Sequence, residues 1–193
     1  MKKLLLFSIL CLFLSACQNN ETSDTQRKQE RYIRHYEEVI ENTIFSSRNA
    51  APFDISVAMN RLADGTYRYD IIIDNPKVAM YNIEIIAIEN NISYQNATKL
   101  MPTFGIFDST AYNMIPYQTN VDNGYVKGII VSGVTADTTI NLKIKVTWTD
   151  YSRVESSRIF VEMEVDFYNQ DMKVEEIIED IPEEDGELHD VEE

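Results

Sequence analysis

The sequence predicts a mainly β fold, an antiparallel β-sandwich that follows one amphipathic helix. Two observations indicate this class. Between Phe53 and Phe167 the apolar residues recur at every second position, which is the period of a strand with one buried face. The same stretch has hardly any helical periodicity and yields six or seven strands, a pattern that favours a sandwich. With 193 residues, the chain has the length of one domain.

Residues 1–16 have the features of a secretory signal peptide. Lys2 and Lys3 form a positive start, and a thirteen-residue run over 4–16 is broken only by serines. A membrane-spanning helix needs about 20 apolar residues, so this run is too short to span a bilayer. We therefore exclude it from the predicted fold.

The run ends in Leu14-Ser15-Ala16-Cys17, which resembles the lipobox of bacterial lipoproteins. The resemblance implies cleavage before Cys17 and attachment of acyl chains such as palmitate to this residue. We therefore expect a lipid anchor at the extracytoplasmic face of the cell membrane. Gln18 follows in place of the aspartate that marks inner-membrane retention, so in a Gram-negative cell the expected site is the outer membrane. The alternative is an ordinary signal peptide with Cys17 near the cleavage site by chance.

Residues 17–24 are predicted to be a lipidated cysteine with a polar linker, and residues 25–46 an amphipathic helix. Apolar residues of this helix recur at three and four positions, namely Tyr32, Ile33, Tyr36, Val39, Ile40 and Ile44. Its basic residues precede its acidic ones. Two interpretations stay open: the basic end faces anionic lipid headgroups, or the helix packs on its domain with a solvated face that includes Glu30–Arg34 and Arg34–Glu38 pairs.

The predicted β-sandwich covers residues 50–170 and opens with a hairpin. Two alternating runs flank a three-residue loop over 63–65, with Gly65 in the left-handed position. Residues 81–88 are apolar on both faces, which predicts a central strand, and residues 125–134 form a further strand.

The last two strands present apolar residues on one face and charged residues on the other. The apolar residues are Ile140, Leu142, Ile144, Val146 and Trp148 on one strand and Ile159, Val161, Met163, Val165 and Phe167 on the other. Antiparallel pairing with an odd sum of residue numbers places lysines opposite carboxylates. Lys143–Glu164 with Lys145–Glu162 is one of several such registers. The carboxylates also fit metal or acid–base chemistry, but the opposing lysines favour a solvated sheet face.

The number and pattern of strands are similar to those of immunoglobulin-like sandwiches. The Cys–Trp–Cys pattern of true immunoglobulin domains is absent, so the similarity rests on strand count and alternation. Together with the lipobox, the chain loosely resembles the small Ig-like lipoproteins of Gram-positive bacteria.

Residues 90–124 are rich in Asn, Thr, Ser and Tyr and interrupt the strands. A long irregular segment of this composition is typical of a recognition loop. The candidate binding residues are Tyr94, Met101, Phe104, Tyr112, Met114 and Tyr117. The alternative is that these side chains only cover the open edge of the sandwich. A short strand is also expected around residues 104–107.

Residues 171–193 form the last unit. Val174, Ile177, Ile178 and Ile181 have helical spacing, which predicts a short helix over 172–181. Eleven acidic residues between 175 and 193 predict a disordered acidic tail after it. This helix is expected to dock on a partner or on the N-terminal helix, unless the tail is only a solubilising appendage.

The composition excludes several function classes. The 32 Asp+Glu against 17 Lys+Arg argue against nucleic acid as a partner. Cys11 would leave with the signal peptide and Cys17 would carry lipid, so no disulfide, thiol chemistry or cysteine zinc site is expected. With His35 and His189 as the two histidines and no catalytic motif, we expect no catalytic residues, no cofactor and no metal.

These observations predict a non-catalytic, membrane-anchored envelope lipoprotein that acts as a protein-interaction or adaptor module. The first alternative is a lipoprotein that binds a small molecule, a glycan or peptidoglycan through its aromatic residues. An envelope hydrolase with paired carboxylates is a third possibility.

Overall fold

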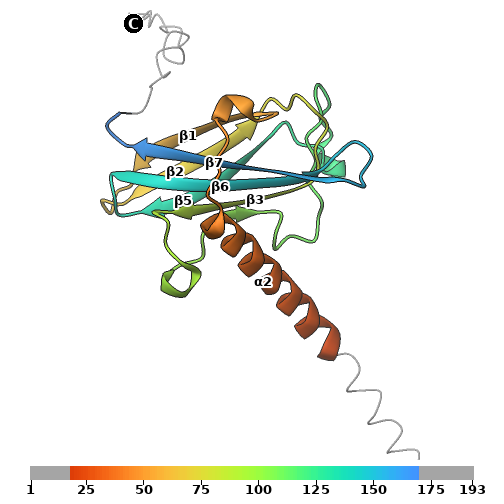
Figure 1. Ribbon diagram of the computed structural model, residues 1–193, viewed down its shortest axis with the longest axis horizontal. Helices are drawn as coiled ribbons and strands as arrows, with labels where there is room; N and C mark the ends of the chain where they lie inside the picture. Colours follow the sequence, from red (N-terminus) through yellow and green to blue (C-terminus); the bar gives the residue numbers. More distant parts are fainter. Residues whose placement is uncertain (1–17, 170–193) are drawn as a thin grey trace, which may run out of the picture.

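The computed structural model describes residues 18–169; the predicted signal peptide, Cys17 and the predicted C-terminal helix and tail lie outside the described residues. The fold is mainly β, as predicted. Two antiparallel sheets share one core, and a long helix precedes them (Figure 1).

The first sheet has three strands, β1 (Asp54–Arg61), β2 (Tyr67–Asp74) and β5 (Gly128–Thr135), in the order β1-β2-β5. The predicted hairpin joins β1 to β2. Leu62 N donates to Thr66 O at 2.8 Å across the loop. Gly65 has a φ of +88°, so the prediction of a left-handed glycine is confirmed. Strand β5 begins three residues later than predicted, because Tyr125 instead forms isolated bridges in the preceding loop.

The second sheet has four strands, in the order β4-β3-β6-β7. Their bounds are β3 (Tyr81–Glu89), β4 (Thr103–Phe104), β6 (Thr139–Thr149) and β7 (Ser156–Asp166). Strand β3 lies between two neighbours, as expected of a strand that is apolar on both faces. The short strand expected around 104–107 is β4, two residues long, at the edge beside β3.

Strands β6 and β7 pair antiparallel with an odd sum of residue numbers, as predicted. Ile144 lies opposite Val161, so apolar side chains meet on the core face. The register places Lys143 opposite Glu162 and Lys145 opposite Phe160, two residues away from the Lys143–Glu164 register.

Helix α2 spans Gln18–Glu41 rather than residues 25–46. Residues 18–24, predicted as a linker, are its first turns, and no proline or glycine interrupts them. After Glu41 the Asn42 side chain donates to the backbone oxygen of Ile44, a local bond that competes with the helix. Ile44 therefore lies outside the helix and is exposed.

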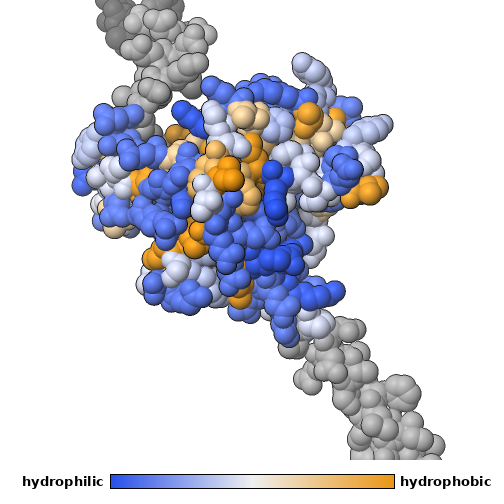
Figure 2. Space-filling view, viewed as in Figure 1, coloured by the Kyte–Doolittle hydropathy of each residue, from blue (hydrophilic) through white to orange (hydrophobic). Residues whose placement is uncertain are grey.

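The C-terminal half of α2 packs on the outer face of the four-stranded sheet, whereas its first turns project beyond the sheets (Figure 1). Its buried residues Tyr32, Tyr36 and Val39 contact Ile86 and Ile88 of β3 in a second apolar cluster. This contact explains why β3 is apolar on both faces. On the face seen in Figure 2, the surface of α2 is mainly hydrophilic.

The covering by α2 corrects one prediction. The face of β6 that carries Lys143 and Lys145 was expected to be solvated, but only 2% of Lys145 is exposed. Alternation shows that a strand has a polar face; it does not show whether a helix from another part of the chain lies on that face.

Candidate functional site

The structure brings the six candidate binding residues to different places. Met114 is buried in the main core. The rings of Phe104 and Tyr112 pack on each other with centroids 4.6 Å apart, and Phe104 contacts the core. Tyr117 is fully exposed and has a positive φ of 62°. These four residues share no site.

Tyr94 and Met101 come together beside α2. Met101 is buried in the second apolar cluster, and Tyr94 is partly buried against it. Tyr94 belongs to the short helix η2 (Tyr94–Asn96), in the loop that follows β3. Tyr94 lines the cavity described next, and Met101 lines a different one beside Glu89 and Lys99.

A groove of about 780 Å³ lies between the N-terminal half of α2 and this loop. We call it the α2 groove. It is lined by Thr25, Lys28, Gln29 and Tyr32 of the helix, by Tyr94, Gln95, Ala97, Thr98, Lys99 and Leu100 of the loop after β3, and by Phe107 of the loop after β4.

Aromatic rings form a fixed part of the groove lining. The ring centroid of Tyr32 lies 6.2 Å from that of Tyr94 and 5.3 Å from that of Phe107. The Tyr32 hydroxyl accepts a hydrogen bond from Met101 N at 3.0 Å. Burial, opposed in part by this bond, raises the pKa of Tyr32. Tyr36 behind it donates to a backbone oxygen at 2.9 Å, and burial raises its pKa to about 12.

The groove exposes two large apolar side chains, and its two lysines are paired. Leu100 is 63% exposed and Phe107 36% exposed. Lys28 lies 3.2 Å from an Asp24 carboxylate oxygen and donates to a serine hydroxyl. Lys99 lies 2.7 Å from Glu89. With both lysines paired, the groove presents exposed apolar side chains among the neutral polar groups of Thr25, Gln29, Gln95 and Thr98.

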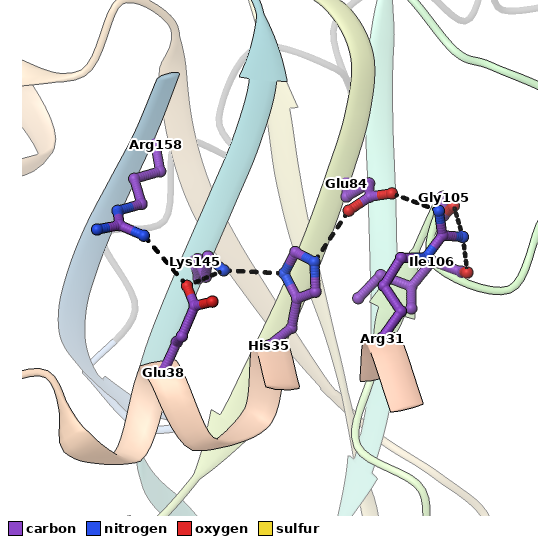
Figure 3. A network of polar contacts seen from close by, with 8 residues as sticks. All are labelled: Arg31, His35, Glu38, Glu84, Gly105, Ile106, Lys145 and Arg158. Atoms are coloured by element: carbon purple, nitrogen blue, oxygen red, sulfur yellow. Dashed lines mark hydrogen bonds and ion pairs between the residues drawn. The ribbon is translucent and has the colours of Figure 1, made fainter. Parts of the chain in front are cut away.

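A network of charged side chains joins α2 to the sheet beside the groove (Figure 3). The buried Lys145 donates to Glu38 Oε2 at 2.6 Å and to His35 Nδ1 at 3.0 Å. Because an ammonium group only donates, Nδ1 of His35 accepts and its proton lies on Nε2. Nε2 in turn lies 3.0 Å from Glu84 Oε2, and Arg158 reaches Glu38 at 3.4 Å.

Arg31 extends the network toward the groove. Its Nη1 lies 2.9 Å from Glu84 Oε1, and its Nη2 donates to the backbone oxygens of Gly105 and Ile106. Arg31 thereby joins three segments, α2, β3 and the loop after β4. The basic end of α2 is therefore used partly inside the protein.

The charges in the network shift one another's pKa. Burial raises the pKa of Glu38, but the hydrogen bond and charge of Lys145 outweigh it, so the pKa is lowered overall. For Glu84, burial is likewise outweighed by the His35 hydrogen bond and the Arg31 charge, and its pKa is lowered. Burial lowers the pKa of Lys145, with Glu38 opposing it. Both carboxylates are held ionised by their partners.

The arrangement fits a structural clamp better than a catalytic centre. Both ring nitrogens of His35 are engaged, so it has no free nitrogen to serve as a base. Within residues 18–169 no group of three or more His, Cys, Asp or Glu side chains could hold a metal ion. No helix of the described part is both long and apolar enough to cross a membrane.

The sequence analysis missed most of these residues. Tyr32 and Tyr36 appeared in the predicted apolar stripe of the helix, but nothing local placed Phe107 beside them. The predicted Glu30–Arg34 and Arg34–Glu38 pairs do not form between these described residues, because Glu38 faces Lys145 and Arg158 instead. The sequence indicated this network only through the mixed charges of the helix and of the strand face that it covers.

A search for similar proteins finds no matching family model, no matching curated protein and no matching solved structure.

Proposed function

We propose that the chain is a non-catalytic lipoprotein of the bacterial cell envelope, anchored through Cys17, that binds a protein partner in the α2 groove. The observation that carries the binding role is the groove itself. It exposes Leu100 and Phe107 over an aromatic lining, and exposed apolar surface with a polar surround is typical of interaction sites.

The anchor is supported by the lipobox, and α2 relates its position to that of the groove. α2 begins at Gln18, the residue after Cys17. An α-helix rises 1.5 Å per residue, so Thr25 at the groove lies about 11 Å along the helix from Gln18. A partner in the groove would therefore lie close to the membrane, which favours another membrane or envelope protein.

The strand order supports an immunoglobulin-like sandwich for the domain. In chain order the seven strands β1 to β7 correspond to A, B, C, C′, E, F and G of that fold, with A-B-E in one sheet and C′-C-F-G in the other. Such domains occur in many cell-surface proteins, often as interaction modules, in keeping with an adaptor role.

The anchor is tested by metabolic labelling of expressing cells with an alkyne analogue of palmitate. We expect the wild-type chain to be labelled and to partition into the detergent phase of a cloud-point extraction. Cys17→Ala should lose both properties, whereas Cys11→Ala, a cysteine substitution inside the predicted signal peptide, should keep them. Labelling that persists in Cys17→Ala would contradict the proposed anchor.

The partner is tested by a photo-crosslinking amino acid placed at Gln95, on the groove, or at Asn60, an exposed position on β1. We expect one envelope protein to be crosslinked reproducibly from Gln95 and not from Asn60. Leu100→Asp should abolish the product, whereas Ile130→Asp, an equally drastic change at an exposed residue of β5, should leave it intact. The same products from both positions would refute the groove as the binding surface.

A ligand with an aromatic-stacking group, such as a glycan or another small molecule, is the second candidate. The concave shape and the rings of Tyr32, Tyr94 and Phe107 favour it. Tyr112 and Tyr117 lie elsewhere, so a platform of three exposed tyrosines around one concave site is not formed. Groove crosslinks limited to small molecules, with no protein product, would favour this candidate.

A further inference from the structure

A second cavity, separate from the α2 groove, lies between the C-terminal half of α2 and the sheet, where β6 ends and β3 and β7 begin. Its volume is about 390 Å³, and we call it the polar cavity. It is lined by Arg34, His35 and Glu38 of α2, Asn82 and Glu84 of β3, Lys145, Thr147, Trp148 and Thr149 of β6, and Ser156 and Arg158 of β7.

The lining carries one more positive than negative charge, in a chain whose net charge is −15. The cations are Arg34, Lys145 and Arg158, and the anions are Glu38 and Glu84. His35 is neutral in the tautomer that its two hydrogen bonds require.

The two carboxylates are committed to groups inside the network. Glu84 contacts His35 and Arg31, and Glu38 contacts the buried ammonium of Lys145 at 2.6 Å. Neither of these described carboxylates contacts Arg34, and Glu38 reaches Arg158 only at 3.4 Å.

Three hydrogen-bond donors in the lining make few or no hydrogen bonds to the described residues. Arg34 is exposed and makes no hydrogen bond or ion pair with any residue in the described part of the chain. Arg158 is 62% exposed and has one long contact, 3.4 Å, to Glu38. The Thr147 hydroxyl is buried and has no hydrogen-bond partner among residues 18–169. Buried polar atoms without a partner are uncommon in native proteins.

We propose that the polar cavity binds a small soluble anion that carries a carboxylate or phosphate group. Arg34 and Arg158 approach it from two different elements, as guanidinium groups do in sites for planar or tetrahedral oxyanions. Lys145, paired with Glu38, lies behind the two arginines in the same lining. At 1.5 Å per residue, Arg34 lies about 24 Å along α2 from Gln18, farther from the proposed anchor than the α2 groove, which favours a soluble anion over a lipid headgroup.

The experiment uses Trp148, which lines the polar cavity and is the only tryptophan of the chain. The full chain in detergent is titrated with inorganic phosphate or succinate at constant ionic strength, with sodium chloride as the control, while tryptophan fluorescence is recorded. We expect a saturable change with phosphate, succinate or both, and none with chloride.

Variants locate the site. Arg34→Gln together with Arg158→Gln should weaken the binding at least tenfold, because charge-assisted hydrogen bonds are lost. Both side chains are exposed, so the fold should persist, which far-UV circular dichroism checks. Arg61→Gln, an exposed arginine on β1 outside the cavity, should leave the dissociation constant unchanged.

Three results would overturn the proposal. The first is a response to phosphate and succinate no different from that to chloride. The second is a dissociation constant that the Arg34 and Arg158 substitutions do not change. The third is a response that appears only in bilayers containing phosphatidylglycerol, which would assign a lipid headgroup instead of a soluble anion.

Discussion

Replacing Lys145 by methionine removes the central charge of the network beneath α2 while nearly keeping the length of the side chain. Lys145 is 2% exposed and donates both to His35 and to Glu38. In the variant, a buried acceptor on His35 loses its donor, and Glu38 keeps only the long contact to Arg158. The change therefore breaks a buried pair without replacing it.

The expected loss of stability follows from these contacts. An unsatisfied buried acceptor costs about 1–3 kcal/mol, and a hydrogen bond to a charged group contributes about 1.5–3 kcal/mol. The desolvation of a buried ammonium, which the variant no longer has, offsets part of this sum. Because Glu38 is also 32% exposed to water, we expect a net loss of about 2–3 kcal/mol. For a chain of this size, that lowers the Tm by about 5–10 °C.

The assay is urea unfolding of the full chain, compared with Lys143→Met. Lys143 points from the same face of β6 two residues away, but it is half-buried and donates to the side chain of Asn91. We expect that control to change stability by no more than about 0.5–1 kcal/mol. A second test combines Lys145→Met with Glu38→Gln. The double variant should lose less stability than the sum of the losses in the two single variants, because the two side chains contact each other. A Lys145→Met protein as stable as wild type would show that desolvation outweighs the contacts and that the network is no clamp.

Three further predictions concern the same region. The pKa values of Glu38 and Glu84 are lowered from the usual 4.5, so their contribution to stability is present above pH 4.5 and is lost as the pH falls through the lowered values. Urea unfolding between pH 7 and 3 should show the free energy of unfolding falling with pH. The same measurement on a Glu38→Gln/Glu84→Gln variant should show a weaker dependence on pH. Gly105→Ala should destabilise the protein by about 1–3 kcal/mol more than Gly65→Ala. Both glycines have a positive φ, but a Cβ added at residue 105 meets a backbone oxygen at 2.2 Å, whereas one added at residue 65 meets nothing within 4 Å. Thermal melts of the two variants measure the difference. Tyr36→Phe should cost about 1 kcal/mol in the same melts, because its hydroxyl donates to a backbone carbonyl.

The strands could be predicted from the sequence because each has one face in a shared core. The alternation in the last two strands required paired residues to have an odd sum of residue numbers. An even sum would have turned the apolar residues of one strand outward. The alternation did not fix the register, because Lys143 meets a carboxylate whether it pairs with Glu162 or with Glu164. Because β3 is apolar on both faces, the sequence also predicted it to be a central strand. It did not predict which part of the chain covers the second face.

The site was less predictable, because its contacts join distant parts of the chain. His35 and Lys145 are 110 residues apart, and no local pattern links them. The composition of residues 90–124 singled out Tyr94 and Met101 together with Met114 and Tyr117. The last two proved to lie in the core and in open solvent. Aromatic residues in a loop look alike in sequence whether they fill a core, line a groove or face water.

The position of α2 links these observations. The helix forms one wall of the α2 groove and one wall of the polar cavity, and the Lys145 network is part of the lining of the polar cavity. Weakening the network should therefore loosen the groove even though Lys145 does not line it. We expect Lys145→Met to reduce the partner crosslink from Gln95 under conditions where the protein remains folded, and Lys143→Met to leave it unchanged. Equal crosslinking in both variants would mean that the aromatic cluster around Tyr32 alone holds the helix in place.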